Sequence, residues 1–277
     1  GMDLDGLRRT VGLDTEALYA GKHEAVRVPE QIIGFVLFMT LRALDYAHTF
    51  DFGGGAIGLV HRDISPGNIL LDSHRGFVKL SDFDVAVASG DQQGQGQIAG
   101  KVPYMAPEVL VGDLADARSD IYALGLVAYE LATRLNPNVR PQVLHSVIGT
   151  VTEVMLSVEK PLVPPHQVVE GLSEGFSDLV CKMLERDPAK RHQSAAEALE
   201  EVSVLLFERG YGPTTSSLVK YFDVLQDPDR KLPPEERTAL RFLDWRRGIA
   251  AVRPPWTPTE QALGAFERGE NPARIEE

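Results

Sequence analysis

The chain has 277 residues, of which 43% are hydrophobic and 25% are charged, as is ordinary for a soluble globular protein. Its net charge of −12 argues against a nucleic-acid partner, because acidic side chains outnumber the basic ones that neutralise phosphates. The single cysteine, Cys181, excludes an intramolecular disulfide and is typical of a reducing compartment. No apolar run reaches the roughly 18 residues that a membrane-spanning helix needs, and no signal peptide is recognised. We therefore expect a cytoplasmic protein with no membrane span.

The first half of the chain alternates one helix, short strands and loops. Apolar residues recur at helical spacing over residues 32–48, which predicts a buried amphipathic helix that the glycines at 53–55 break. Short apolar runs at 69–72 and 76–80 flank a polar turn and predict a small β-hairpin. Residues 89–100 are rich in Gly and Gln, a composition that predicts a mobile loop.

The second half is predicted to be mostly helical, from residue 119 to 207. Its apolar run at 121–132 predicts a core helix, and Cys181 lies in another helical run, where we expect a buried small hydrophobe and no nucleophile. Residues 208–277 change character, because Gly-Pro, Asp-Pro and Pro-Pro pairs interrupt two predicted helices at 216–225 and 235–248. We divide the chain into residues 1–207 and a helical or linker extension, 208–277. The class is mainly α (α+β).

The motifs that carry chemistry begin with a His-Arg-Asp sequence ending at Asp63, followed five residues later by Asn68. An Asp-Phe pair beginning at Asp82 and an Ala-Pro-Glu sequence ending at Glu108 come next. Phosphoryl transfer needs carboxylate and amide oxygens around a nucleotide and its magnesium ions, and a further carboxylate at the substrate hydroxyl. The order of these motifs is that of the protein-kinase signature. The chain therefore resembles the eukaryotic-type serine/threonine protein kinases, and its loop is similar to that of bacterial members.

This resemblance implies a protein kinase-like fold, of which the chain represents the C-terminal lobe with a small β-hairpin at the catalytic cleft. It assigns to Asp63 the catalytic role of accepting or orienting the proton of the substrate hydroxyl, and to Asn68 and Asp82 the binding of the Mg²⁺ ions that bridge the nucleotide phosphates. His61 and Phe83 are expected to stack as supports. The implied cofactors are ATP and Mg²⁺, and the implied partner is a protein substrate.

The resemblance also implies three structural supports for the site. Arg62 normally meets a phosphate on the activation segment. Asp120 is expected to hold the backbone of the catalytic loop, and Glu108 and Arg191 are expected to form an ion pair that anchors the activation segment.

One departure from the family concerns the amino-terminal lobe, which in kinases carries a Gly-rich loop, an ATP-contacting lysine and its glutamate partner. Residues 1–30 precede the first helix and hold no Gly-x-Gly-x-x-Gly sequence. We expect this lobe to be encoded elsewhere in the same gene, because a half-cleft would expose a large apolar face. Gly1 is then either an interior residue or a cloning scar before Met2, and the fragment alone is expected to be inactive.

A second departure is Asp84, where the family has Gly after Asp-Phe. Asp tolerates similar backbone angles, and its charge near the metal would either hold magnesium more tightly or misplace it. A third is paired: Ser65 stands where many members have a phosphate-contacting Lys, and Lys101 where they have a Thr. These positions face each other in the family fold, so we hypothesise that Lys101 supplies the missing charge as a catalytic residue next to Ser65. The alternative is a solvated loop lysine.

Between residues 82 and 104 the only hydroxyl side chain is that of Ser89, which lies far from the usual phosphoacceptor position. Because phosphorylation orders this segment in many kinases, we predict an enzyme that it does not switch. The function predicted is transfer of the ATP γ-phosphoryl group to protein serine or threonine hydroxyls. The alternative is a pseudokinase-like scaffold, which Asp84, Ser65 and the absent lobe favour and the intact metal and base residues oppose. A small-molecule phosphotransferase is disfavoured by the Ala-Pro-Glu sequence.

Overall fold

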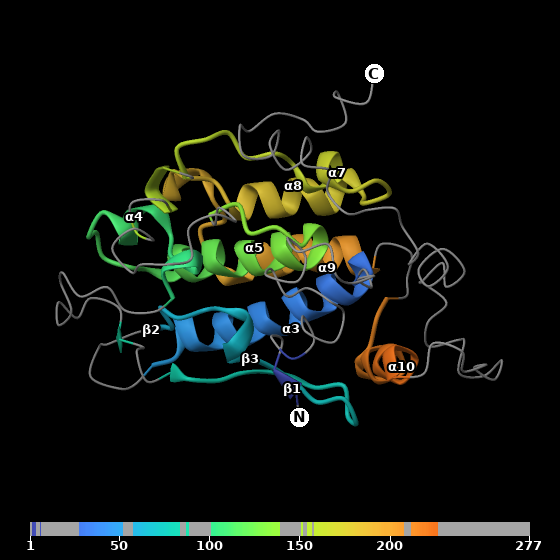
Figure 1. Cartoon of the computed structure of the whole chain (residues 1–277). Coiled ribbons are helices and arrows are strands. Elements are labelled where there is room, and N and C mark those ends of the chain that lie inside the picture. The colour runs from blue at the N-terminus through green and yellow to red at the C-terminus, as the bar shows by residue number, and fades with distance from the viewer. Residues whose placement is uncertain are drawn as a thin grey trace, which may run out of the picture.

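The computed structural model of the chain describes residues 2–3, 6, 28–51, 58–83, 87–88, 101–138, 151, 154–156, 158–207 and 212–226. Helices and short strands are distributed over these ranges (Figure 1). In chain order the elements are β1 (Met2–Asp3), α3 (Glu30–Thr49), β2 (Leu59–Val60), the 3-10 helix η1 (Pro66–Asn68), β3 (Ile69–Leu71), β4 (Val78–Leu80), β5 (Val87–Ala88), the 3-10 helix η3 (Val102–Tyr104), α4 (Pro107–Leu110), α5 (Ala117–Thr133), α7 (Pro165–Val168), α8 (Glu174–Met183), the 3-10 helix η4 (Pro188–Lys190), α9 (Ala195–Phe207) and α10 (Thr215–Gln226).

The first long helix, α3, confirms the helix predicted at residues 32–48. Its apolar positions, among them Ile33, Leu37 and Leu41, are buried against the core, while the other side of the helix carries the partly exposed residues. The helix ends at Thr49, after which Phe50 adopts an extended backbone. The glycines at 53–55 lie outside the described residues.

The central helix, α5, confirms the core helix predicted from the apolar run. A capping box begins it, in which the Asp116 side chain accepts a backbone N–H and the Ser119 hydroxyl accepts the backbone N–H of Asp116. Arg134 ends it in the left-handed conformation, with φ of 69°. Figure 1 shows α5 between α3 and α8, and it packs on α3, α8 and α9. Because it is covered on all these sides, α5 is buried from residue 119 to 133.

The predicted hairpin is present as β3 and β4, which pair antiparallel with Ile69 opposite Leu80. β1 was not predicted and pairs antiparallel with the other edge of β3, giving the sheet order β1-β3-β4. β2 and β5 form a separate antiparallel pair. β4 packs against α3, so the small sheet lies on the helical core. The mainly α (α+β) class is thereby confirmed.

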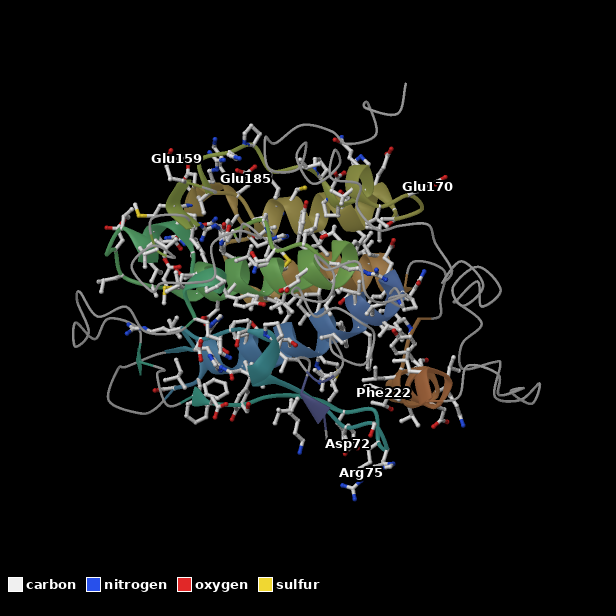
Figure 2. The ribbon with its side chains drawn as sticks, viewed as in Figure 1. Asp72, Arg75, Glu159, Glu170, Glu185 and Phe222 are labelled. Carbon is white, nitrogen blue, oxygen red and sulfur yellow. The ribbon has the colours of Figure 1, made fainter. Side chains whose placement is uncertain are left out.

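The extension begins with α10, which confirms the helix predicted at 216–225. Leu218, Tyr221 and Phe222 are buried in the same hydrophobic cluster as α3 and α5. Figure 2 shows Phe222 on α10 near the hairpin turn. The turn and the start of α10 are in close contact, because a Cβ added at Gly76, which has φ of +69°, would lie 1.9 Å from the Thr215 carbonyl oxygen. The start of the extension therefore packs on the domain. The division at residue 207 stays a prediction.

The remaining predictions about the fold concern one loop, one helix, the burial of Cys181 and the absence of a membrane-spanning helix. The loop predicted at 89–100 and the helix predicted at 235–248 lie outside the described residues. Cys181 was expected to be a buried small hydrophobe and is only half-buried, because α8 is amphipathic and this residue lies at the edge of its apolar face. Across the described ranges, every helix is too short or too polar to cross a membrane.

Candidate active site

The loop that carries the candidate catalytic residues, residues 61–68 and called the catalytic loop below, is fixed at its start by the carboxylate of Asp120, in the first turn of α5. Asp120 Oδ2 accepts the backbone N–H of His61 and Oδ1 accepts that of Arg62, each at 2.8 Å. Arg62 has a left-handed backbone, with φ of 67°. Such a conformation is unfavourable for a residue other than glycine and persists only where the surroundings impose it. The two hydrogen bonds from the core helix supply that constraint, as expected for Asp120.

A third donor to Asp120 was not foreseen from the sequence. His48, in the last turn of α3, places Nε2 2.8 Å from Asp120 Oδ2. The carboxylate therefore joins α3, α5 and the catalytic loop. No sequence motif indicated this contact, because the two residues are 72 positions apart and a histidine is common in the last turn of a helix.

The catalytic loop is also joined to the segment that carries Asp82. The rings of His61 and Phe83 are in contact, with centroids 4.5 Å apart, but they are tilted by 59° and do not stack face to face as expected. His61 Nε2 lies 2.8 Å from the Ser81 carbonyl oxygen, and the Ser81 backbone N–H donates to the Asn68 carbonyl oxygen at 2.9 Å. Asn68 and Asp82 are consequently held in neighbouring segments.

The side chain of Asp63 is half-buried and is held at both oxygens. Asn68 Nδ2 donates to Asp63 Oδ2 at 2.8 Å and to the Asp63 carbonyl oxygen at 2.7 Å. The backbone N–H of Lys101 donates to Asp63 Oδ1 at 3.1 Å. The carboxylate is thus oriented by its own loop and by a segment 38 residues further along the chain. This geometry suits a group that must meet a proton in one direction.

The Ser65 and Lys101 side chains, paired as a hypothesis from the sequence, are in contact. Lys101 Nζ lies 2.9 Å from Ser65 Oγ, while Ser65 is buried and Lys101 is exposed on its other side. The structure therefore places the Lys101 ammonium group against Ser65, which follows Asp63 by two positions in the chain.

The ion pair expected between Glu108 and Arg191 is present. Two guanidinium nitrogens of Arg191 donate to the two carboxylate oxygens of Glu108, at 2.8 and 2.7 Å. The Arg191 guanidinium also lies over the ring of Tyr122, 4.7 Å from its centroid, and its side chain has no exposed surface. Burial raises the pKa of Tyr122 to about 12, so that the phenol next to this cation stays protonated at neutral pH.

Comparison with models of known protein families shows the family to which the chain belongs. The model of the protein kinase domain matches residues 13–202 of the chain. The chain belongs to the protein kinase family.

Three relatives illustrate the similarity of this kinase domain to curated proteins. It is 31% identical over 201 residues to a probable serine/threonine-protein kinase PknB of Bifidobacterium longum, covering 71% of this chain and 26% of the relative. It is 32% identical over 209 residues to mitogen-activated protein kinase kinase 1 of Arabidopsis thaliana, covering 75% and 54%. It is 34% identical over 172 residues to serine/threonine-protein kinase PknB of Mycobacterium leprae, covering 61% and 25%. The chain thus spans about a quarter to about half the length of these relatives.

The match confirms the expectation of a protein kinase-like fold, which a helix-rich core with a small antiparallel sheet also fits. It begins at residue 13 and gives no support to the expectation that the amino-terminal lobe is absent from the chain. Likewise, the restriction of the fold to a C-terminal lobe is not confirmed.

Among the described residues of the kinase domain, Asn68 and Asp82 have the side-chain oxygens that could bind a magnesium ion. Both contacts of Asn68 Nδ2 go to Asp63, which assigns Oδ1 as the oxygen available to a cation. Asp82 is exposed and has a left-handed backbone, with φ of 60°. Within the described ranges no three His, Cys, Asp or Glu side chains form a metal-binding group. A sparse set suits Mg²⁺, which takes one or two protein ligands along with substrate phosphates and water.

Arg62 was expected from the family resemblance to meet a phosphate on the activation segment. Among the described residues, Arg62 Nε is buried and has no hydrogen-bond partner. Asp84 and Ser89 lie outside the described residues, so the departures noted at these positions stay predictions.

Proposed function

We propose that the site serves a serine/threonine protein kinase, which transfers the γ-phosphoryl group of ATP to a hydroxyl group of a protein substrate. The observation that supports this most directly is the position of Asp63. Both of its carboxylate oxygens accept hydrogen bonds, one from Asn68 and one from the Lys101 backbone. A carboxylate oriented in this way beside an amide is what a phosphoryl-transfer site needs at the attacking hydroxyl.

In the proposed reaction the substrate hydroxyl oxygen forms a bond to the γ-phosphorus as the bond from that phosphorus to the β–γ bridging oxygen breaks. ADP leaves, and the hydroxyl proton passes to the Asp63 carboxylate. Asn68 and Asp82 would hold Mg²⁺, which when bound neutralises charge on the phosphates. Asp120 has a positioning role, because its two hydrogen bonds set the backbone of His61 and Arg62, immediately before Asp63.

Serine and threonine are the proposed acceptors because the named serine/threonine kinases are prominent among the relatives and the loop after Asp63 lacks tyrosine-kinase residues. A relative in Myxococcus xanthus, 36% identical over 179 residues, is named a tyrosine-protein kinase. The acceptor is therefore identified by hydrolysis of the phosphorylated product and separation of its phosphoamino acids. Phosphotyrosine as the main product would overturn this part of the proposal.

A binding scaffold without transfer is the second candidate, and Ser65 favours it by placing a neutral group where many kinases have a lysine. A scaffold has no need of a titratable group at Asp63. Its partners would accordingly bind the Asp63→Asn protein as well as the wild type, and no phosphate would be transferred by either.

The deciding experiment measures transfer of radiolabelled γ-phosphate to a protein substrate in the presence of Mg²⁺. It is run on the chain of 277 residues and, in parallel, on the full-length product of its gene. We expect Asp63→Asn to lower the rate by about 100-fold or more, in line with the loss of general-base catalysis. Asp178→Asn, an exposed carboxylate on α8, is the matched control and is expected to leave the rate unchanged. Absence of transfer in both wild-type proteins, or a wild-type rate in Asp63→Asn, would contradict the proposal.

A further inference from the structure

The turn that carries Lys101 is anchored to the helical core without any phosphate. The backbone N–H of Tyr104 donates to the Lys101 carbonyl oxygen at 2.8 Å and closes the 3-10 helix η3. The Tyr104 hydroxyl donates to Glu130 Oε2 at 2.6 Å, and Glu130 is buried in α5. These contacts give the turn a fixed position relative to the same helix that holds the catalytic loop through Asp120.

A second anchor lies one residue earlier in the turn. The side-chain amides of Asn136 and Asn138 both donate to the Pro103 carbonyl oxygen, at 3.4 Å each. Both asparagines are buried just after α5. Buried amides keep a fixed orientation because leaving their donors unpaired is costly. The sequence did not indicate either anchor.

The anchored turn presents Lys101 to the catalytic loop through two different groups. Its backbone N–H reaches Asp63 Oδ1, and its Nζ reaches Ser65 Oγ at 2.9 Å. A serine hydroxyl is neutral, so it orients the ammonium group without cancelling its charge. Within the described residues Lys101 has no carboxylate at ion-pair distance, and an ammonium group has two N–H donors left after bonding Ser65. Salt-bridged surface lysines, such as Lys182 between Glu197 and Glu201, are different in this respect.

We propose that Lys101 is a catalytic residue that contacts the transferred phosphoryl group and carries the positive charge that Ser65 does not provide. This inference rests on the proposed kinase function and names a residue outside the catalytic loop as the source of the cation. Charge spreads over the oxygens of the phosphoryl group in the transition state, where a fixed cation lowers the barrier most effectively. Because the same residue also holds Asp63, one anchored turn sets the base and the cation together.

The first test compares lysine variants of the full-length gene product. Lys101→Met is expected to lower kcat by about 100-fold and to raise the KM for ATP by no more than about tenfold, with the KM for the protein substrate changed less than about threefold, because the contact is strongest in the transition state. Lys101→Arg is expected to keep part of the activity, since it keeps the charge. Lys79→Met is the matched control, because Lys79 is an exposed lysine on β4. Equal small effects of Lys101→Met and Lys79→Met would overturn the proposal.

A reciprocal exchange separates the charge from the fold. Lys101→Thr alone removes the cation, whereas Ser65→Lys combined with Lys101→Thr returns a cation to the same place from the opposite side. The double variant is expected to recover at least about tenfold in kcat over Lys101→Thr, the scale of one charge-assisted hydrogen bond. A folded double variant, judged by its thermal transition, with no more activity than Lys101→Thr would count against the proposal.

Nucleotide affinity gives a readout that does not depend on transfer. Calorimetry measures the affinities for Mg²⁺ with ADP and for Mg²⁺ with a non-hydrolysable ATP analogue. Lys101→Met is expected to weaken binding of the ATP analogue by about tenfold relative to ADP, because only the analogue has the terminal phosphate. An unchanged ratio would refute the contact. A wild-type protein that transfers no phosphate would instead overturn the proposed function, and the affinity ratio would still decide whether Lys101 meets the phosphate.

Discussion

The helical core and the loops that carry the candidate catalytic residues are stabilised in different ways. In the core, α5 contributes Leu124, Val127 and Tyr129, none of which has exposed surface. In the loops, Asp63 is half-buried and depends on hydrogen bonds from Asn68 and from the Lys101 backbone. Burial of apolar side chains stabilises the folded state in proportion to the surface area removed from water, and it has little directional preference. Hydrogen bonds, in contrast, weaken steeply when their angles change. Substitutions in the two regions are therefore expected to separate stability from turnover.

The largest loss of stability is expected from Arg191→Met, which removes a buried charge that is ion-paired within the core. Removing the guanidinium leaves the Glu108 carboxylate without its ion-pair partner and removes the contact with the Tyr122 ring. Breaking a buried ion pair from one side costs about 3–5 kcal/mol. Chemical denaturation measures the loss, with Lys190→Met, an exposed neighbour, as the control. A loss below about 1 kcal/mol would show that this ion pair behaves like a surface pair.

The next largest loss is expected from Leu124→Ala, which opens a cavity in the centre of α5. A substitution of this kind costs about 2–5 kcal/mol, and Leu114→Ala, at an exposed position, serves as its control. Because the core does not orient the reacting groups directly, kcat per folded molecule is expected to stay within about twofold of wild type. A large fall in kcat at a temperature where the protein is folded would mean that the two regions are not separable.

Asp120→Asn is expected to give the reverse result, in the same helix. An amide has one acceptor oxygen, so either His61 or Arg62 loses the partner of its backbone N–H. We expect a stability loss of about 1–3 kcal/mol, the cost of leaving one buried N–H donor without a partner. Turnover is expected to fall about 100-fold, since displacing the loop by 1 Å has effects of this size. Wild-type kcat in this variant would show that the loop keeps its course without the carboxylate.

The smallest effect is expected at Cys181, on the edge of the core, where folding is expected to slow the chemical modification of the thiol. Burial raises the pKa of this thiol from 9.0 to about 11, so the reactive thiolate forms only as the pH rises toward that value. At pH 8 the folded protein is expected to react with iodoacetamide about 100-fold more slowly than the unfolded protein, because two pKa units correspond to that factor. Mass spectrometry of samples with and without guanidinium chloride follows the reaction. Equal rates would place the thiol in an aqueous environment.

The sequence predicted the local parts of the fold and site well. Asp63 and Asn68 are five residues apart in one loop, and their contact follows from that spacing. The contact of Lys101 with Ser65 was expected from the family resemblance, which carries information that spacing lacks. His48 was missed because its partner Asp120 lies on another helix, and nothing near His48 in the sequence distinguishes it. The sequence left open whether the helical extension packs on the domain, where Leu218 and Phe222 are buried, because the period of an amphipathic helix does not identify the surface that it contacts.

By itself the sequence determined the helical period of α3 and α5, the β3–β4 hairpin and the order of the carboxylate and amide groups. These features depend on side chains within one or two turns of the chain, and hydrophobic period and turn chemistry act over that range. Only the tertiary structure decided that Asp120 reaches Arg62 across 58 positions and that Arg191 reaches Glu108 across 83. The packing of α5 against α3 and α8 brings such residues together, and that packing depends on the shapes of whole helix surfaces.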